Sequence, residues 1–238
     1  MNSEGTKSIR FQYRFQLTDG RALSFDIKLN PVTLKKRSNI KGELPEWTRL
    51  TFNQCPHCPL DESEHSHCPM AVSLIEPIEA LGDVKSYDKA KITVTTPERI
   101  TGTRSTIQEG LSAMMGLIMP TSGCPHTGFF RPMARFHLPF ATESETLYRV
   151  STMYLMAQLL RREKGLEADF DLQGINPIYD NLRTLNKAMV TRLSAANDLD
   201  SAINAVVLLD QFAANFTYSL EDPLEAFETL FSSYLQDG

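Results

Sequence analysis

All four cysteines of this 238-residue chain are followed by proline, and three of them lie in one histidine-rich segment. They are Cys55, Cys58, Cys68 and Cys124. The first two form a Cys-x2-Cys pair, a spacing that lets two sulfur atoms reach one metal ion from a tight turn. We therefore predict that the four cysteines are the ligands of a single metal centre.

Two kinds of metal group fit four thiolates. Structural zinc occupies many scattered cysteine quartets, and we expect zinc here, in a regulatory or interaction protein. A 4Fe-4S cluster in a redox or sensor protein is the alternative. Cys-Pro also occurs at cluster ligands of bacterial ferredoxins, although the ferredoxin spacing itself is absent. A hydrolytic enzyme with an open zinc site is a third interpretation, and it requires a water in place of one cysteine.

The proline after each cysteine constrains the backbone at the predicted site. It removes one N–H near the sulfur and disfavours helical geometry for the cysteine itself. Pro69 also suits the first position of the helix expected after it, so Cys68 is predicted to be the N-cap of that helix. The positive end of the helix then favours the thiolate form of Cys68.

Histidines and arginines near the cysteines are further candidates. His57 and His126 each stand two residues after a cysteine, in the pattern Cys-Pro-His, and each could donate to a metal-bound sulfur. His126 with Arg131 and Arg135 forms a candidate cofactor-binding set, in which the arginines hold an anion beside the metal. The alternative is a buried connecting segment whose arginines pair with nearby carboxylates.

The composition limits the class of protein. The net charge is −5, with acidic and basic residues mixed, so binding to nucleic acid is not favoured. No apolar stretch is long enough to span a membrane, and the N-terminus lacks a signal-peptide pattern. We expect a cytoplasmic protein, where thiols stay reduced and metal ligation is favoured over disulfides. An unidentified protein partner is compatible with this composition.

Two alternating segments near the N-terminus predict an antiparallel hairpin. Apolar residues alternate with polar ones from Phe11 to Leu17 and again from Leu23 to Leu29. A three-residue loop at Thr18–Gly20 would pair Phe15 with Leu23 and place the apolar side chains on one face. We therefore predict this loop rather than a two-residue turn at Asp19-Gly20.

The remaining elements are predicted from period and capping signals. Strands are expected at 47–52, around 92–94 and at 98–103. Apolar spacing predicts a helix over 70–81, which Pro77 should kink or shorten. Capping boxes predict helix starts at Thr142 and Thr106. Further starts are expected at the Asn-Pro and Asp-Pro pairs 176–177 and 222–223, and at Asp198 or Asp200 for a helix through residue 216.

This order of strands followed by helices predicts an α+β fold, with an N-terminal antiparallel sheet packed against a mainly helical C-terminal part. Residues 1–104 would form the β-rich part with the cysteine loop, and residues 105–238 the helical part that contributes Cys124. Because the metal ligands lie on both sides of residue 104, we expect one continuous body.

Two stretches resemble an uncharacterised bacterial protein family of unknown function. The first contains Cys-Pro-His-Cys-Pro-Leu and His-Cys-Pro-Met; the second contains Ser-Gly-Cys-Pro-His-Thr and Arg-Pro-Met-Ala-Arg-Phe-His-Leu-Pro-Phe. The resemblance covers about the first two thirds of the chain. It implies a bacterial cytoplasmic setting and no particular activity.

Overall fold

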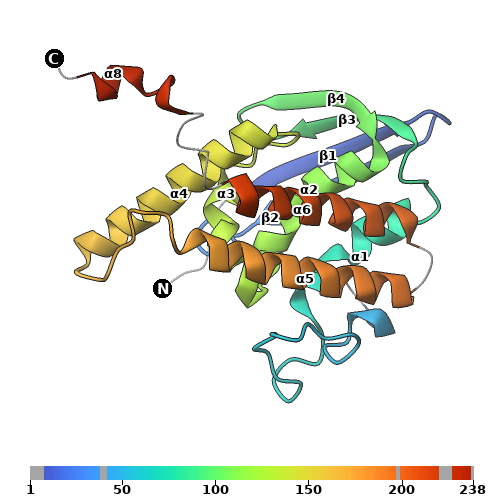
Figure 1. The fold of residues 1–238 in the computed structure, drawn as a ribbon. Helices are drawn as coiled ribbons and strands as arrows, with labels where there is room; N and C mark the ends of the chain where they lie inside the picture. The colour runs from blue at the N-terminus through green and yellow to red at the C-terminus, as the bar shows by residue number, and fades with distance from the viewer. Residues whose placement is uncertain (1–7, 38–41, 197–198, 220–226, 237–238) are drawn as a thin grey trace, which may run out of the picture.

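The fold is α+β, as predicted: a four-stranded antiparallel sheet is covered on one face by helices (Figure 1). The computed structural model describes residues 8–37, 42–196, 199–219 and 227–236. The strands are β1 (Ile9–Leu17), β2 (Ala22–Leu29), β3 (Lys89–Thr95) and β4 (Ile100–Thr106), in the order β2-β1-β3-β4.

The N-terminal hairpin has the predicted register. Phe15 pairs with Leu23. The backbone N–H of Leu17 donates to the carbonyl of Arg21 (2.9 Å), which closes the three-residue loop. Gly20 has a φ of 92°, a left-handed conformation that glycine adopts without strain. The inward-facing side chains of β1 are buried while their neighbours are exposed, so the pleat gives the sheet one core face.

Helix α1 (Pro69–Leu81) continues through Pro77, and the predicted early end of its regular part is wrong. Proline leaves the carbonyl four residues earlier without a helical donor. That carbonyl belongs to Ser73, and the Lys36 ammonium donates to it at 3.0 Å. A side chain from outside the helix thus replaces the missing hydrogen bond.

Both predicted capping boxes are present. Thr106 begins α2 (Ile107–Thr121) and Thr142 begins α4 (Glu143–Glu163). Each threonine accepts from the backbone N–H of a glutamate three residues later, and the glutamate accepts from the threonine backbone. A 3-10 helix η2 (Pro125–Phe130) and a short helix α3 (Arg131–Arg135) lie between α2 and α4.

The C-terminal part contains α5 (Ile175–Ala196), α6 (Asp200–Ser219) and α8 (Ser232–Leu235). Helix α6 starts at Asp200, one of the two predicted positions. Helix α5 starts before Asn176, so the prediction of Asn176 as its N-cap is wrong. Asp169 organises this start instead, because its carboxylate accepts from the N–H groups of Asp171 (2.9 Å) and Gly174 (2.7 Å). The predicted start at 222–223 lies outside the described residues.

The predicted strand at 47–52 is wrong. A 3-10 helix η1 (Glu46–Thr48) stands there and is succeeded by turns. The strand pairing is reduced to one isolated bridge between Arg49 and His67. A buried side chain of α5, Arg192, accounts for this difference, because its guanidinium donates hydrogen bonds to several carbonyl groups of the segment.

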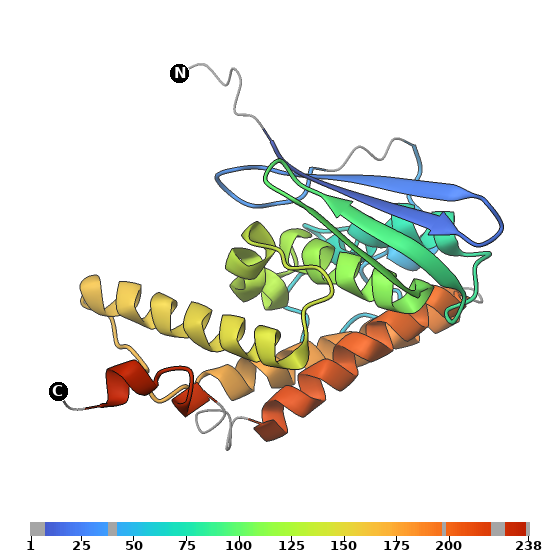
Figure 2. The same ribbon diagram turned by 90° about the horizontal axis from the view of Figure 1, so that it is seen from above.

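The helices form two layers beneath the sheet (Figure 2). Helices α1 and α2 lie against the sheet, α6 packs against α2 on the side away from the sheet, α5 packs against α6, and α4 extends outward. One hydrophobic core contains residues of β1, β3, α1, α2, α5 and α6 and therefore draws on both sides of residue 104, which itself lies in β4. In the described part of the chain, no helix is long and apolar enough to cross a membrane.

Candidate metal centre

The first three cysteines lie on a loop that leaves η1 and returns to α1. The loop is closed at its base by backbone hydrogen bonds from Cys68 to Thr48 (2.8 Å) and from Leu50 to Ser66 (3.0 Å). Within it, the N–H of Cys58 donates to the carbonyl of Cys55 at 3.0 Å. The Cys-x2-Cys pair therefore forms the tight turn that its spacing predicted.

Cys68 is the N-cap of α1, as predicted. Its backbone is extended, with φ −68° and ψ 117°, and Pro69 is the first helical residue. The carbonyl of Cys68 accepts the first helical hydrogen bond from Val72 (3.0 Å), while its side chain makes no capping hydrogen bond. The sulfur is thus left available near the positive end of a 13-residue helix.

Cys124 is brought to the same region from the far end of α2, although 55 residues separate it from Cys68. The chain leaves α2 through Gly123, whose φ is 100°. A Cβ atom placed on Gly123 would lie 3.8 Å from Cβ of Pro69, so the two Cys-Pro segments are adjacent. Cys124 is 8% exposed and packs into the same core as Cys55 and Cys68.

The two Cys-Pro-His segments contact each other directly. The rings of His57 and His126 stack at 3.9 Å between centroids, and Nε2 of His126 donates to the carbonyl of His57 at 2.9 Å. Nε2 of His57 donates in turn to the carbonyl of Asn181 on α5 (3.1 Å). Its Nδ1 is buried and has no hydrogen-bond partner among the residues that the structure describes. The repeated motif in the sequence therefore marks a real contact.

The thiols are close enough for their charges to interact. Burial is the main cause that raises the pKa of Cys55 to about 12, and the charges of Cys68, Cys58 and Cys124 contribute to the rise. Burial also raises the pKa of Cys124 to about 11, opposed by the backbone N–H groups of His126 and Thr127, which stabilise its thiolate. Without a cation, both buried thiols therefore hold their protons at neutral pH.

Arg192 of α5 is the charged residue that sequence reasoning missed. Its side chain is almost fully buried, and no carboxylate among the described residues pairs with it. Its guanidinium donates to four loop carbonyls: Trp47 (2.8 Å), Arg49 (2.6 Å), Leu50 (3.1 Å) and Asn53 (3.5 Å).

Arg192 also explains the loss of the predicted strand. Successive carbonyls of a strand point in opposite directions, so four nearby carbonyls that converge on one guanidinium require a curved backbone. Burial lowers the pKa of Arg192, an effect that thiolates at Cys68, Cys55 and Cys58 would oppose, and the charge of Arg192 acts to lower the pKa of Cys55. A lone arginine among the apolar residues Leu185, Met189 and Leu193 of α5 was the available sequence signal.

The four cysteines are free thiols that lie in one region of the molecule, and their side chains are not arranged as ligands around one point. Within the described ranges, no group of three or more Cys, His, Asp or Glu side chains has the geometry to hold a metal ion. The arrangement brings the predicted residues to one place and leaves the metal itself as a prediction.

The three residues of the predicted anion clamp have different neighbours, and the clamp stays a prediction. His126 lies beside the cysteines, stacked on His57. Arg131 packs against Gly128, and its Nε is buried without a hydrogen-bond partner among the described residues. Arg135 instead lies over the ring of Phe136 at 5.1 Å.

Comparison with known proteins identifies a family. The family model described as "Domain of unknown function (DUF6901)" matches residues 11–232, so the chain belongs to that family. No curated protein and no solved structure gives a significant match.

Proposed function

We propose that Cys55, Cys58, Cys68 and Cys124 bind one structural zinc ion, in a protein with a regulatory or interaction role. The observation that carries the proposal is the meeting of two distant Cys-Pro-His segments beside a buried arginine that lacks a carboxylate partner among the described residues.

The charges at the site support an anionic centre. Four thiolates around Zn²⁺ carry a net charge of about −2, which the Arg192 guanidinium would partly balance. Buried thiols with raised pKa values are neutral in the apo state, so zinc binding would release protons and convert them to thiolates. The N–H groups directed at Cys124 would stabilise its thiolate in the same way.

The local backbone supports closure around an ion. Between Asn53 and Ser66 the loop contains only turns and bends, so its sulfur atoms can move without breaking a helix or a ladder of strand pairs. Cys68 and Cys124, by contrast, are anchored at the ends of α1 and α2. Zinc would join a deformable loop to two fixed points.

The interaction role rests on the segment after Cys124. Phe129 and Phe136 are 61% and 72% exposed, and both lie within 12 residues of this cysteine. A metal that fixes Cys124 would also fix the segment that presents these aromatic side chains to a partner. Zinc occupancy would then control that surface.

Elemental analysis of the full chain, purified without oxygen, tests the metal. We expect a colourless protein with one zinc ion per chain and no thiol that reacts until the zinc is chelated. Iron with acid-labile sulfide and a brown colour would assign the alternative 4Fe-4S cluster to the same thiolates. Metal-free protein with four reactive thiols would overturn both.

Substitution tests the ligand set. Cys124→Ser should lower the melting temperature and the metal content together, since a structural site with three ligands holds zinc less tightly. His65→Gln is the control, because His65 is exposed on the loop between Cys58 and Cys68. Full zinc retention in Cys124→Ser would instead favour an open three-ligand site, the hydrolytic interpretation.

A further inference from the structure

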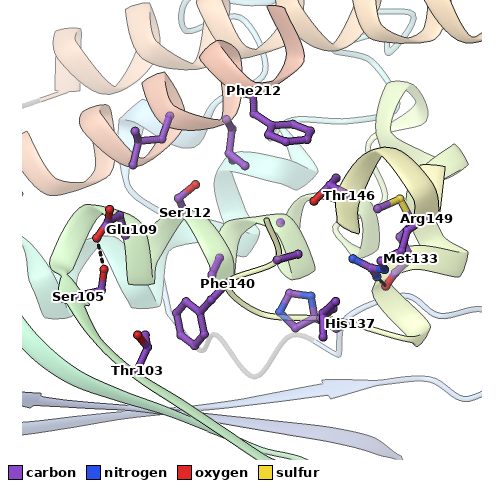
Figure 3. A pocket seen from close by; sticks show the side chains of 16 residues that line it. Thr103, Ser105, Glu109, Ser112, Met133, His137, Phe140, Thr146, Arg149 and Phe212 are labelled. Atoms are coloured by element: carbon purple, nitrogen blue, oxygen red, sulfur yellow. Dashed lines mark hydrogen bonds between the residues drawn. The ribbon is translucent and has the colours of Figure 1, made fainter. Parts of the chain in front are cut away.

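A cavity of about 480 Å³ lies away from the cysteines, between α2, α4, α6 and the segment that joins α3 to α4 (Figure 3). This volume is in the range of small-molecule sites. Phe140 and Phe212 line the cavity between two ends that carry polar side chains, and Leu208 and Leu209 add to its apolar lining.

Arg149 provides the charge at one end of the cavity. One nitrogen, Nη2, donates to the carbonyls of Met133 (3.1 Å) and Phe136 (2.9 Å). These are the hydrogen bonds of this guanidinium to the described residues, and none of their carboxylates forms an ion pair with it. A guanidinium has five N–H donors, so most of them remain for a ligand.

His137 adds a neutral donor beside Arg149. Burial, together with the charge of Arg149, lowers the pKa of His137 to about 3, so the ring is neutral. Its Nε2 shares a hydrogen bond with the hydroxyl of Tyr13, a fully buried phenol whose pKa is raised by burial. A phenol that keeps its proton here donates it to Nε2, because a buried hydroxyl hydrogen without an acceptor is costly. The proton of His137 is then on Nδ1, as a second donor.

Glu109 and Ser105 line the opposite end of the cavity. The Glu109 carboxylate accepts from the Ser105 hydroxyl and from the backbone N–H of Thr106 (3.0 Å), which lower its pKa. This end is therefore negatively charged and disfavours a second anionic group on a ligand.

The two glycines of α2, Gly110 and Gly116, differ in the space beside them. A Cβ atom on Gly110 would lie 2.6 Å from Cε1 of Phe15 and also collide with Ile92, so packing requires glycine there. Gly116 lines the cavity, and a Cβ atom on it would meet nothing within 4 Å. Glycine inside a helix costs about 1 kcal/mol relative to alanine, and the packing of the chain itself does not require this one. Close approach of a ligand would explain it.

We propose that this cavity binds a small organic monocarboxylate with an apolar body. Its carboxylate lies between Arg149 and His137, and its body lies against Phe140 and Phe212 and passes over Gly116. Charge-assisted hydrogen bonds fix the carboxylate end, and apolar burial supplies most of the remaining affinity. This proposal stands independently of the metal.

Calorimetric titration of the full chain with octanoate tests the proposal, with 1-octanol and octanedioate as matched probes. We expect octanoate to bind at least about tenfold more tightly than either, because octanol lacks the charge and octanedioate brings a second anion toward Glu109. Equal binding of octanoate and octanol, or no binding of octanoate, would overturn the proposal.

Substitutions at Gly116 locate the site without damaging the fold. Gly116→Leu should fill the cavity, since a helical leucine leans toward Ser112 and Ala113, which also line it. It should abolish octanoate binding while the melting temperature stays at or above that of the wild type. Gly116→Ala, the matched control, should weaken octanoate binding less than Gly116→Leu does, because one methyl group at the point of close approach fills only a small part of the cavity. Undiminished binding in a folded Gly116→Leu protein would place octanoate elsewhere and refute the site.

Substitution of Arg149 tests the recognition of the carboxylate. Arg149→Gln should remove the preference for octanoate over octanol and leave octanol binding nearly unchanged. An unchanged preference would contradict the assigned role of Arg149.

Discussion

Two arginines, Arg192 buried and Arg149 half-buried, serve two regions of this molecule in different ways. Arg192, beside the cysteines, gives four hydrogen bonds to four loop carbonyls. Arg149, at the cavity, uses one nitrogen for two carbonyls. The first guanidinium is nearly saturated by the chain and shapes the backbone around it. The second is held in place by two bonds and retains donors for another molecule. The number of donors already used separates a structural arginine from a binding one.

The largest expected effect comes from removing the saturated arginine. Arg192→Met should destabilise the fold by about 3–5 kcal/mol, because four carbonyls lose their donor in a buried place. Arg149→Gln should cost only about 1–2 kcal/mol, since two hydrogen bonds are lost. Urea unfolding of both variants and the wild type measures the difference. A smaller loss of unfolding free energy in Arg192→Met than in Arg149→Gln would contradict the structural role assigned to Arg192.

The free energy of unfolding should depend on pH because of His137, a residue that lines the cavity. The pKa of His137 is about 3 in the folded protein and about 6.5 in the unfolded chain. Between these pH values the unfolded chain binds a proton at His137 and the folded protein does not. Stability is therefore lost as the pH falls from 6.5 toward 3, by about 2 kcal/mol at pH 5.

The measurement for His137 is urea unfolding at pH 7 and pH 5. The groups that face His137 are Tyr13 and Arg149, and neither titrates in this interval. His137→Gln keeps an acceptor for the Tyr13 hydroxyl and should reduce the pH dependence by that amount. An equal pH dependence in the variant would show that His137 is protonated in the folded state.

The smallest expected effects separate the two glycines of α2. Gly110→Ala should destabilise the protein by about 1–3 kcal/mol, because the new methyl group collides with Phe15 and Ile92. Gly116→Ala should stabilise it by about 0.5–1 kcal/mol through helix propensity, since its Cβ enters open space. Thermal melts of both variants measure these shifts. A loss of stability in Gly116→Ala would mean that packing, and not the cavity, requires this glycine.

Local signals predicted local structure well. The alternation in β1 and β2 set the register, because only a three-residue loop puts both sets of apolar side chains on one face. The capping boxes at Thr106 and Thr142 and the N-cap role of Cys68 depend on neighbours within three or four residues. Such features need no knowledge of distant parts of the chain.

Predictions failed where a distant residue decided the conformation. Segment 47–52 was predicted to be a strand, but its carbonyl groups accept hydrogen bonds from the Arg192 guanidinium. Arg192 lies more than 130 residues away in the sequence, so no local pattern indicates this contact. Helix α1 passes Pro77 because Lys36 replaces the lost donor. Helix α5 starts before Asn176, and the turn that leads into it is held by Asp169, whose carboxylate accepts from the N–H groups of Asp171 and Gly174.

The α+β order, the hairpin register and the choice of the four cysteines as candidates follow from the sequence alone, because period, capping and spacing are properties of neighbouring residues. The packing of the folded chain is needed to show that Cys124 lies near the other cysteines, that Arg192 lies beside them, and that Arg149, His137 and Gly116 line one cavity. These groups come from separate helices and loops, and their distances are set by how the layers pack. Packing, unlike period, cannot be read from a single stretch of chain.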